Sequence, residues 1–510
     1  MEENNTTKRI AKNTLMLYFR QILIMIVSLY TVRVVLNTLG AEDYGIYNVV
    51  AGVVVLFSFV NNAMATATQR FLNFNLGKSD AEKTQQTYSA SLLIHIGIAL
   101  IFVILAETVG LWFVNTKLNI PLERHSAAMW CYQFSIITTV FNILRVPYNA
   151  VIIAYEKMSF FAWVSIVEAV LKLLVVYLLI ISPLDKLVAY VILLTLVSII
   201  ILFCYKIYCN KKFSTAHYKK VTDYSLVKEI LGFSGWSLFG ATANVANQQG
   251  TNIVLNMFTN VTVNAAMGIA NQVNNAVYSF VSNFQTAFKP QLVKSYAAGK
   301  KEEFNGLIIR SAKFSFYLDE SPNIFFILFI QLSTLNLDFV LQIWLKNVPD
   351  FSIGFVKLIL IYSLFESING PLWLAVQATG KIKKYQIIVS CLIFSNLPLS
   401  IIAFSLGANP YWVLLIRIIL ECFITMFRLL YLNKTQKFSV ISYVKNVMIP
   451  VLIVMIVSFI ITSLLSSCFS GLVFFFISCA ISVIVNILLV CIVGINKNER
   501  KMIVNFFKRG

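Results

Sequence analysis

Long apolar stretches, separated by short polar connections, follow one another through almost the whole chain. A helix needs about 20 apolar residues to cross the hydrocarbon core of a bilayer. Stretches of this kind fall at residues 14–37, 46–66, 87–113, 125–152, 159–181, 187–205, 229–258, 263–288, 305–333, 352–378, 386–405, 411–432, 446–466 and 472–494. The pattern predicts an all-α integral membrane protein with about 14 transmembrane helices.

Composition agrees with this pattern and excludes a water-soluble globular protein. Of the 510 residues, 58% are hydrophobic and only 12% are charged, whereas soluble domains are about 25% charged. The mean hydropathy is +0.78. The connections between the apolar stretches leave no room for a sizeable soluble domain, so we expect the bilayer to be the main solvent of this chain.

The formal net charge of +19 has a topological explanation. Most basic residues lie in the connections that share a side with the N-terminus, whereas the opposite connections hold only Lys117, Arg124, Lys186 and Lys346. Short loops rich in Lys and Arg stay in the cytoplasm. Both termini are therefore predicted to be cytoplasmic, and no nucleic-acid partner is expected.

Short sequence matches recur at a nearly constant offset and indicate an internal duplication. Gly77-Lys78 follows the second stretch and Gly299-Lys300 follows the eighth. Further matches with equal internal spacing are Pro147, Ala154 and Lys157 with Pro371, Ala378 and Lys381, and residues 35–37 with residues 254–256. Matches in this order predict two copies of a six-helix unit in one chain.

The duplication suggests a division of the chain into four parts. We predict an N-terminal six-helix bundle at residues 1–210, a basic cytoplasmic linker at 211–228 and a C-terminal six-helix bundle at 229–435. Residues 436–510 have no counterpart in the first half. They are expected to add two transmembrane helices and a basic cytoplasmic tail.

Polar residues inside apolar stretches are costly in a bilayer, so they mark candidate functional positions. They concentrate in the first two stretches of each predicted bundle and follow helical spacing. The candidates for a substrate cavity are Arg20, Arg33, Asn61, Asn62, Arg145, Asn244, Asn247, Gln248, Thr251, Asn271, Asn275 and Gln285. Amides and hydroxyls suit the hydroxyl groups of a sugar, although each amide could equally hold helices together.

Two of these arginines have no acidic residue within one helical turn, namely Arg20 and Arg145. An arginine in a wet cavity offers a fork for phosphate oxygens. The alternatives are that it extends to the membrane surface or meets a partner from another helix. Arg33 differs, because Glu42 and Asp43 lie just beyond its stretch.

Other intramembrane charges have a partner at helical spacing. Glu168 with Lys172 and Arg417 with Glu421 are four residues apart, as in structural ion pairs along one helix. We interpret both pairs as structural.

Two carboxylates stand alone in their stretches and are candidates for ion coupling. Glu107 lies in the third stretch and Glu366 in the tenth, and a hydrogen-bonded structural carboxyl is the alternative for each. His95 is interpreted as a packed, hydrogen-bonded side chain. The eight cysteines show no metal-ligand spacing with the histidines, so neither a metal nor a cofactor is expected.

Two motifs near the N-terminus resemble a known family. They are LGAEDYGIY from Leu39 to Tyr47 and ATQRF from Ala67 to Phe71. Together with the number of stretches, the duplication and the basic middle connection, they are similar to the polysaccharide-biosynthesis flippases. These are the Wzx-like O-antigen or capsule repeat-unit transporters of the multidrug/oligosaccharidyl-lipid/polysaccharide exporter superfamily.

The resemblance implies a MATE-like fold, a V-shaped pair of bundles in the bacterial cytoplasmic (inner) membrane. The implied activity is the transport of undecaprenyl-diphosphate-linked oligosaccharides from the cytoplasmic to the periplasmic leaflet by alternating access. The products would serve the biosynthesis of lipopolysaccharide O-antigen, capsule or exopolysaccharide. The implied partners are the lipid-linked glycan, membrane lipids and the polysaccharide polymerase machinery, with a proton gradient, a cation gradient or the membrane potential as driving force.

Three alternatives stay open from sequence alone. A lipid II flippase would share the fourteen spans and the cationic cavity. A multidrug and toxin extruder, which exports small molecules by cation coupling, would normally have about twelve spans and an acidic residue in its cavity. A membrane enzyme would present a large outer loop or an acidic catalytic cluster. Glu42 and Asp43 are more typical of a solvated loop pair, so no catalytic activity is expected.

Overall fold

The computed structural model describes residues 2–55, 58–117, 121–259, 261–317 and 348–468, with the single positions 337, 341, 342, 481, 485, 488 and 489. All regular structure in these residues is helical. The long helices are α1 (Glu2–Val55), α2 (Ser58–Gly77), α3 (Ala81–Leu105), α5 (His125–Ala154), α6 (Met158–Ile181), α7 (Lys186–Lys212), α8 (Tyr224–Phe258), α9 (Val261–Ala297), α10 (Lys301–Tyr317), α13 (Ser352–Thr379), α14 (Lys383–Ser405), α15 (Trp412–Gln436) and α17 (Ile449–Cys468). The short elements are η1 (Ala106–Gly110), α4 (Leu111–Lys117), η2 (Leu122–Arg124), η3 (Ser214–Ala216), α16 (Val440–Tyr443) and η4 (Val444–Met448).

The predicted all-α, multi-pass architecture is confirmed for the described residues. Seven helical segments in them are long and apolar enough to cross a membrane. The predicted first, second, seventh and eighth spans also form helices, namely α1, α2, α8 and α9. The predicted span at 305–333 is described only to Tyr317, and the span at 472–494 falls almost wholly outside the described residues. The duplication and the orientation of the chain stay predictions.

A bend at Gly40 divides α1 into two spans. Its φ of 81° and ψ of 167° lie in a region that residues with a β-carbon avoid. The first predicted span therefore ends before Gly40, and the second begins immediately after it without a longer loop.

The chain forms two compact units. The N-terminal unit comprises Ala11–Ala241, and the C-terminal unit comprises Met1–Ile10 with Thr242–Gly510. The division falls inside α8, which is one continuous helix.

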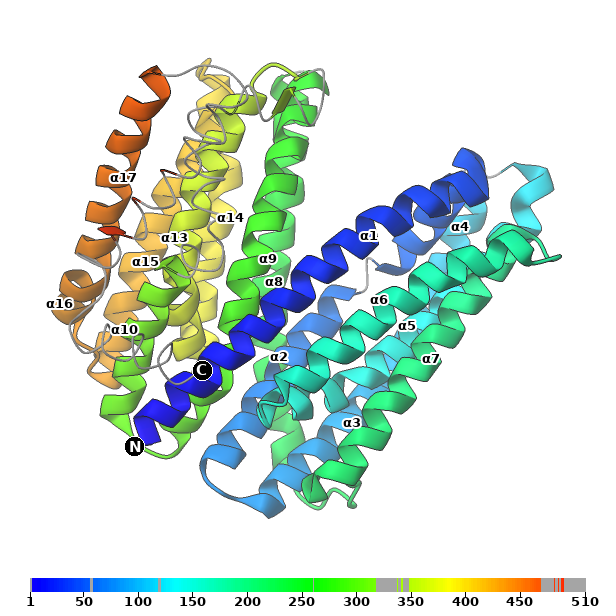
Figure 1. Ribbon diagram of the computed structural model, residues 1–510, viewed down its shortest axis with the longest axis horizontal. Helices are drawn as coiled ribbons and strands as arrows, with labels where there is room; N and C mark the ends of the chain where they lie inside the picture. The colour runs from blue at the N-terminus through cyan, green and yellow to red at the C-terminus, as the bar shows by residue number, and fades with distance from the viewer. Residues whose placement is uncertain are drawn as a thin grey trace. The chain divides into compact units, whose positions relative to one another are not determined.

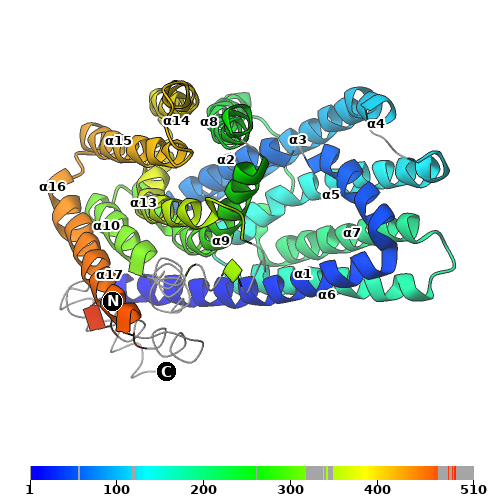
Figure 2. The ribbon, with the colours of Figure 1, turned by 90° about the horizontal axis from the view of Figure 1, so that it is seen from above.

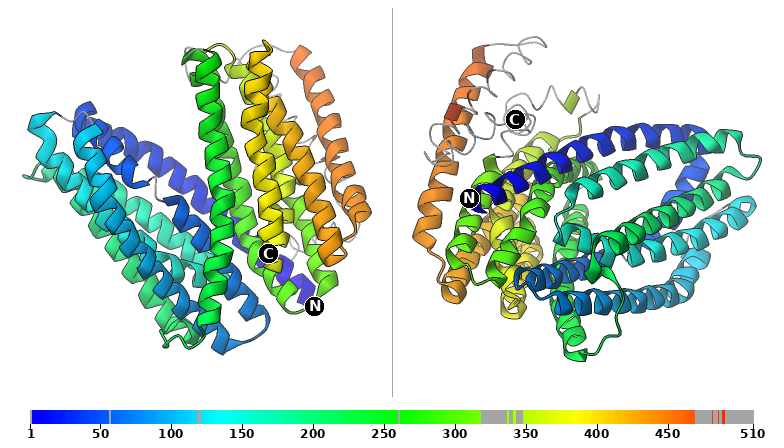
Figure 3. Two further views of the ribbon diagram at one scale, coloured as in Figure 1. Left: turned by 180° about the vertical axis from the view of Figure 1, so that it is seen from behind. Right: turned by 60° about the horizontal axis from the view of Figure 1, so that its bottom comes forward.

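Helix α5 is the centre of the N-terminal unit. It packs against α2, α3 and α7, and Figures 1 and 3 show it running beside α6 and α7. Its buried face includes Ala128, Ala150 and Ala154, none more than 4% exposed. Small residues let helix backbones approach closely in a bilayer, where contact between helices depends on packing more than on the hydrophobic effect.

Helix α13 has the same central place in the C-terminal unit. It packs against α9, α10 and α15, which surround it in Figure 2. Gly370 of α13 lies directly under the amide of Gln285 from α9, and a β-carbon at this position would collide with that amide. The tight α9–α13 contact therefore depends on a glycine.

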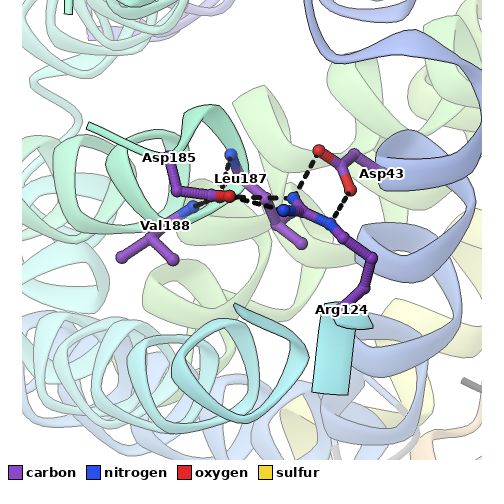
Figure 4. A network of polar contacts seen from close by, with 5 residues as sticks. All are labelled: Asp43, Arg124, Asp185, Leu187 and Val188. Carbon is purple, nitrogen blue, oxygen red and sulfur yellow. Dashed lines mark hydrogen bonds and ion pairs between the residues drawn. The ribbon is translucent and has the colours of Figure 1, made fainter. Parts of the chain in front are cut away.

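An arginine clasp, formed by Asp43 of α1, Arg124 of η2 and Asp185 before α7, joins three distant parts of the N-terminal unit (Figure 4). Arg124 binds Asp43 with two donors, at 2.8 Å from Nε and 2.6 Å from Nη2. It also binds Asp185 at 2.5 Å from Nη1. Asp185 in turn accepts from the backbone N–H groups of Leu187 and Val188 at the start of α7. The clasp ties the chain after the Gly40 bend to the first turns of α5 and α7.

The expectation for Asp43 was wrong. The side chain of Asp43 is only 16% exposed and is bound to Arg124, so it is not part of a solvated loop pair. The contact joins residues 81 positions apart, a distance over which local spacing carries no information.

We expect Arg124→Gln to destabilise the N-terminal unit, because Asp43 would keep a largely covered carboxylate without its charged donor. Hydrogen bonds to charged groups contribute about 1.5–3 kcal/mol when buried, so a loss of about 1–2 kcal/mol is expected for this partly exposed group. Thermal unfolding of the purified full-length protein in detergent at pH 7 measures the effect. Lys186→Gln, which removes an exposed positive charge beside Asp185, is the matched control.

The same comparison should depend on pH. The hydrogen bond from Arg124 lowers the pKa of Asp185 below its ordinary value. A carboxylate with a lowered folded-state pKa stabilises the fold above its unfolded pKa of roughly 3.9 and loses this effect as the pH falls through the folded-state value. The difference between the native protein and Arg124→Gln should thus be full at pH 7 and shrink below about pH 4. A difference that is absent at pH 7, or equal for Lys186→Gln, would contradict the clasp.

Candidate functional site

Four helices of the N-terminal unit bring intramembrane charges together. The Glu168 carboxylate of α6 binds Arg145 Nη1 of α5 at 2.8 Å and Lys172 Nζ of its own helix at 2.8 Å. The predicted Glu168–Lys172 pair is therefore confirmed. For Arg145 the structure favours the partner from another helix that the sequence left open.

Arg20 belongs to the same neighbourhood. Its guanidinium lies over the Phe161 ring of α6, 4.7 Å from the centroid, and Arg145 lies 5.8 Å from the centroid of Tyr205 on α7. Tyr205 is within electrostatic reach of both arginines and of Glu168. We call Arg20, Arg145, Glu168, Lys172 and Tyr205 the cation cluster, since it holds three cations to one carboxylate.

Three residues of the cation cluster lie about two turns or more from the ends of their helices. Arg145 is nine residues from the end of α5 at Ala154, Glu168 is ten from the start of α6, and Tyr205 is seven from the end of α7. At 1.5 Å per residue, these positions are about 10–15 Å from helix ends. The side chains of Arg145 and Lys172 are 24% and 45% exposed. An anion could therefore reach the cluster, and arginine forks suit phosphate oxygens.

Three candidate residues are placed only by their backbone. Arg33 lies in α1, and Asn61 and Asn62 lie in α2. Their side chains are outside the described part of the structure, so their role stays a prediction.

The predicted polar face of α8 divides into two parts. Asn247 and Thr251 are buried at 6% exposure each. Asn247 Oδ1 accepts from Asn396 Nδ2 of α14 at 2.9 Å, as expected of an amide that holds helices together. Asn244 and Gln248 are exposed on the opposite part of the face.

The polar residues of α9 divide in the same way. Gln285 is 8% exposed and packs against Gly370 of α13, and Asn274 accepts from the Ser363 hydroxyl at 2.6 Å. Asn271 is half-buried and Asn275 is exposed. Of the predicted amides on α9, Asn271 and Asn275 are thus the ones available to a ligand.

The accessible amides of α8 and α9 lie at matching heights. Gln248 and Asn271 are each ten residues from the adjoining ends of the two helices, at Phe258 and Val261, and Asn244 and Asn275 are each fourteen. These spacings correspond to about 15 and 21 Å along the helices. Polar side chains at this depth are costly to expose to lipid, which favours a water-filled cavity beside them.

The two candidate coupling carboxylates differ in their surroundings. Glu107 lies in the π-helical turn η1 and accepts from Gln133 Nε2 at 3.2 Å. The π-turn is held by Tyr132, whose hydroxyl donates to the Ala106 carbonyl at 2.6 Å. Glu366 of α13 is half-buried, and no hydrogen bond or ion pair joins its carboxylate to another described residue.

A polar network inside the C-terminal unit was not expected from the sequence. Asn369 of α13 donates to Glu421 Oε1 at 2.6 Å and to Thr425 Oγ1 at 2.7 Å. Arg428 binds Glu421 at 3.3 Å and donates to the Tyr385 hydroxyl at 2.8 Å. The spacing of Glu421, Thr425 and Arg428 along one face of α15 was the available signal.

The predicted Arg417–Glu421 pair was wrong. Glu421 pairs instead with Arg428, and the Arg417 guanidinium lies 4.0 Å from the ring centroid of Tyr362. The ring lies on the neighbouring helix α13, so tertiary packing overrides the four-residue spacing. Arg417, Glu421 and Arg428 all act electrostatically on Glu366.

Neither unit presents a metal centre in its described residues, where no group of three or more His, Cys, Asp or Glu could hold an ion. His95 is fully buried, and its Nδ1 lies 2.7 Å from the Ser91 carbonyl oxygen. This agrees with its interpretation as a packed, hydrogen-bonded side chain.

The fold resembles that of solved membrane transporters. It matches the outward-facing conformation of a multidrug resistance MATE family transporter of the MOP superfamily, with a TM-score of 0.67 at 12% identity, over 84% of this chain and 96% of that one. It also matches a MOP superfamily transporter from Pyrococcus furiosus described by the reverse polarity of its binding pocket, with a TM-score of 0.69 at 11% identity, over 84% and 96%. A MATE protein in the bent conformation gives 0.68 at 12%, over 85% and 97%.

The chain belongs to the polysaccharide biosynthesis protein family, whose model matches residues 10–295. This confirms the family indicated by the N-terminal motifs. The identities to the solved structures are low, so those structures establish the fold alone. A comparison with curated protein sequences gives no significant match.

The two parts of the α8 face can be separated by mutation. We expect Asn247→Ala to lower the free energy of unfolding by about 1–2 kcal/mol, because it removes a buried hydrogen bond and leaves the Asn396 amide without its acceptor. Gln248→Ala, one position along and exposed, should change it by less than about 0.5 kcal/mol. Thermal unfolding of both variants measures this, and equal losses would refute the division.

Proposed function

We propose that this transporter is a flippase for undecaprenyl-diphosphate-linked oligosaccharides. It carries them from the cytoplasmic to the periplasmic leaflet of the bacterial inner membrane by alternating access. The glycan serves surface polysaccharide biosynthesis, and the protein performs no chemical step on it.

The cation cluster carries this proposal. A diphosphate has two negatively charged groups whose oxygens accept parallel hydrogen bonds from guanidinium forks. Arg20 and Arg145 share Tyr205 as a neighbour, and the cluster holds more positive than negative groups. Placing such charges inside the apolar layer costs about 2.5–3.5 kcal/mol each unless they are compensated. An anionic substrate would supply that compensation during transport.

The exposed and half-buried amides of α8 and α9 support an oligosaccharide as the rest of the cargo. Asn244, Gln248, Asn271 and Asn275 offer both donors and acceptors, which match the hydroxyl groups of a sugar. An apolar drug would offer no hydrogen bonds to these amides. Arg33, Asn61, Asn62 and Gln285 are further cavity candidates that the proposal retains from the sequence.

The C-terminal unit is the proposed place of ion coupling. Glu421 is already held by Asn369 and Arg428, whereas the Glu366 carboxylate makes no such bond to a described residue. Glu366 can therefore take up a proton or a cation without breaking an existing hydrogen bond. Protonation would change the charge balance among Glu366, Arg417 and Arg428, and this would favour a different conformation.

The first test is flipping in proteoliposomes. A fluorescent undecaprenyl-diphosphate oligosaccharide is scored for its accessibility in each leaflet, with native protein and with Arg20→Lys and Arg145→Lys. The lysine variants keep the charge but lose the fork, so flipping should fall about tenfold or more, equivalent to one charge-assisted hydrogen bond. Lys206→Gln, which removes the exposed cation next to Tyr205, should flip at the native rate.

Other outcomes point elsewhere. A folded native protein that flips lipid II but no polysaccharide repeat unit would assign it to peptidoglycan precursors. One that flips no lipid-linked glycan but exports small organic cations would assign it to the multidrug extruders. Equal flipping rates for the native protein and both lysine variants would show that the cation cluster does not bind the diphosphate.

A second test addresses coupling. In proteoliposomes with an imposed proton gradient, Glu366→Gln should lose the severalfold acceleration by the gradient and keep the rate without it. Glu107→Gln is the matched control, because Glu107 already holds Gln133. If Glu107→Gln abolishes the acceleration and Glu366→Gln does not, the coupling group lies in the N-terminal unit and this assignment fails.

A further inference from the structure

The connection between α7 and α8 is docked on the N-terminal unit. We call residues 211–224, from the last residues of α7 to the first residue of α8, the connecting strap. The Phe213 ring stacks on Tyr155, with centroids 4.3 Å apart, and the hydroxyls of Tyr155 and Thr215 are 2.7 Å apart. Phe213, Thr215 and Val221 are buried. These buried side chains fix the strap against the ends of α5 and α7.

Helix α3 holds the backbone of the connecting strap. Ser89 Oγ accepts from the Lys219 backbone N–H at 3.0 Å. Gln86 binds Thr222 twice, accepting from its backbone N–H and donating to its hydroxyl, each at 3.3 Å. The Lys219 ammonium also lies 3.3 Å from the Glu82 carboxylate. The strap therefore has a defined conformation, unlike a flexible linker.

The connecting strap lies at one membrane surface. It contacts the first turns of α3 and the last turns of α5 and α7, and all three helices are long and apolar enough to span a bilayer. Figure 3 shows the strap at the same end of the N-terminal unit as the turn between α2 and α3. Its exposed side chains consequently face the headgroup layer or the adjoining water.

Several of those exposed side chains are lysines. Lys211, Lys212 and Lys220 are exposed, and none of them forms an ion pair within the described part of the chain. The strap contains one acidic residue, Asp223, which accepts from the Ser225 hydroxyl and caps α8. This hydrogen bond lowers the pKa of Asp223. The lysines thus leave a positive surface that the protein does not neutralise.

Aromatic residues accompany the lysines on this surface. Tyr218 is 58% exposed and Tyr224 is 76% exposed. Tyrosines with lysines are typical of protein segments that lie at the level of lipid headgroups.

We propose that the connecting strap is a binding site for the phosphate groups of anionic phospholipids. Lys211, Lys212 and Lys220 bind the headgroups, and Tyr218 and Tyr224 lie among them. The inference is independent of the transported substrate. Basic segments beside a membrane bind anionic lipids with about a fivefold gain for each lysine near the surface. The hydrogen bonds to α3 hold the backbone on both sides of Lys220, and Lys211 and Lys212 lie on the last turn of α7. The backbone that carries the lysines is thus ordered before binding, which lowers the entropy lost when a lipid is bound.

The test uses purified full-length protein in detergent, titrated with dioctanoyl phosphatidylglycerol and, in parallel, with dioctanoyl phosphatidylcholine. Binding is followed by intrinsic tryptophan fluorescence at low and high salt. The variant Lys211→Gln/Lys212→Gln/Lys220→Gln should weaken phosphatidylglycerol binding on the order of 100-fold. The matched control, Lys381→Gln/Lys383→Gln/Lys384→Gln, removes the same charge from another connection and should stay within about threefold of the native affinity.

A second variant separates a built site from charge alone. Gln86→Ala/Ser89→Ala keeps every lysine but removes side-chain bonds that hold the connecting strap, so affinity should also fall, by severalfold. The proposal is overturned if the native protein binds both lipids equally, or if the two triple variants lose affinity equally. Full competition by inorganic phosphate at equal concentration would identify a site for soluble anions and would also overturn it.

Discussion

A bilayer supplies no water to a buried polar group, so polar side chains inside the membrane need hydrogen-bond or charge partners within the protein. Several charges within the apolar stretches of the described structure have an arrangement that reduces their cost. Glu168 has two cations, Glu421 has an amide and a guanidinium, and Arg417 has the face of a tyrosine ring. The helices are positioned by these contacts as much as by apolar packing, because lipid tails compete equally well for apolar side chains.

The two units meet this constraint with different charge balances. In the C-terminal unit, two arginines and two glutamates neutralise one another around α13 and α15. In the N-terminal unit, the cation cluster has one carboxylate for three cations. Under the proposed function, this asymmetry would place the groups that bind the anionic cargo in one unit and the group that binds the driving ion in the other. The cargo and the driving ion would then compete less for the same groups.

The sequence predicts the features that depend on periodicity and composition. The all-α class, the multi-pass character and the family follow from long apolar stretches and from two motifs near the N-terminus. The Glu168–Lys172 pair is also predictable, because both residues lie on one helix. The same reasoning fails for Arg417, where a ring from α13 is a closer partner than the residue four positions on.

Contacts between distant segments are the part that sequence reasoning could not supply. The partner of Asp43 is Arg124, and the partner of Asn247 is Asn396, 149 positions away. Along a polar face of a helix, the sequence alone also does not distinguish amides that pack against another helix from amides that are accessible. Asn247 and Gln248 are adjacent amides of similar chemistry, and only the position of α14 distinguishes them.

The continuity of α8 has a consequence for how the chain can be divided genetically. The border between the compact units lies between Ala241 and Thr242, in the interior of this helix. If the chain were cut at residue 210 or 228, most of the first half of α8 would stay on the C-terminal fragment although it packs on the N-terminal unit. The surface of the N-terminal unit on which these turns pack would then be exposed. A cut around Gly299, in the turn between α9 and α10, would keep α8 whole but would divide the C-terminal unit, because α9 packs against α13. The border between the compact units therefore lies about half a helix beyond the connection that separates α7 from α8 in the sequence.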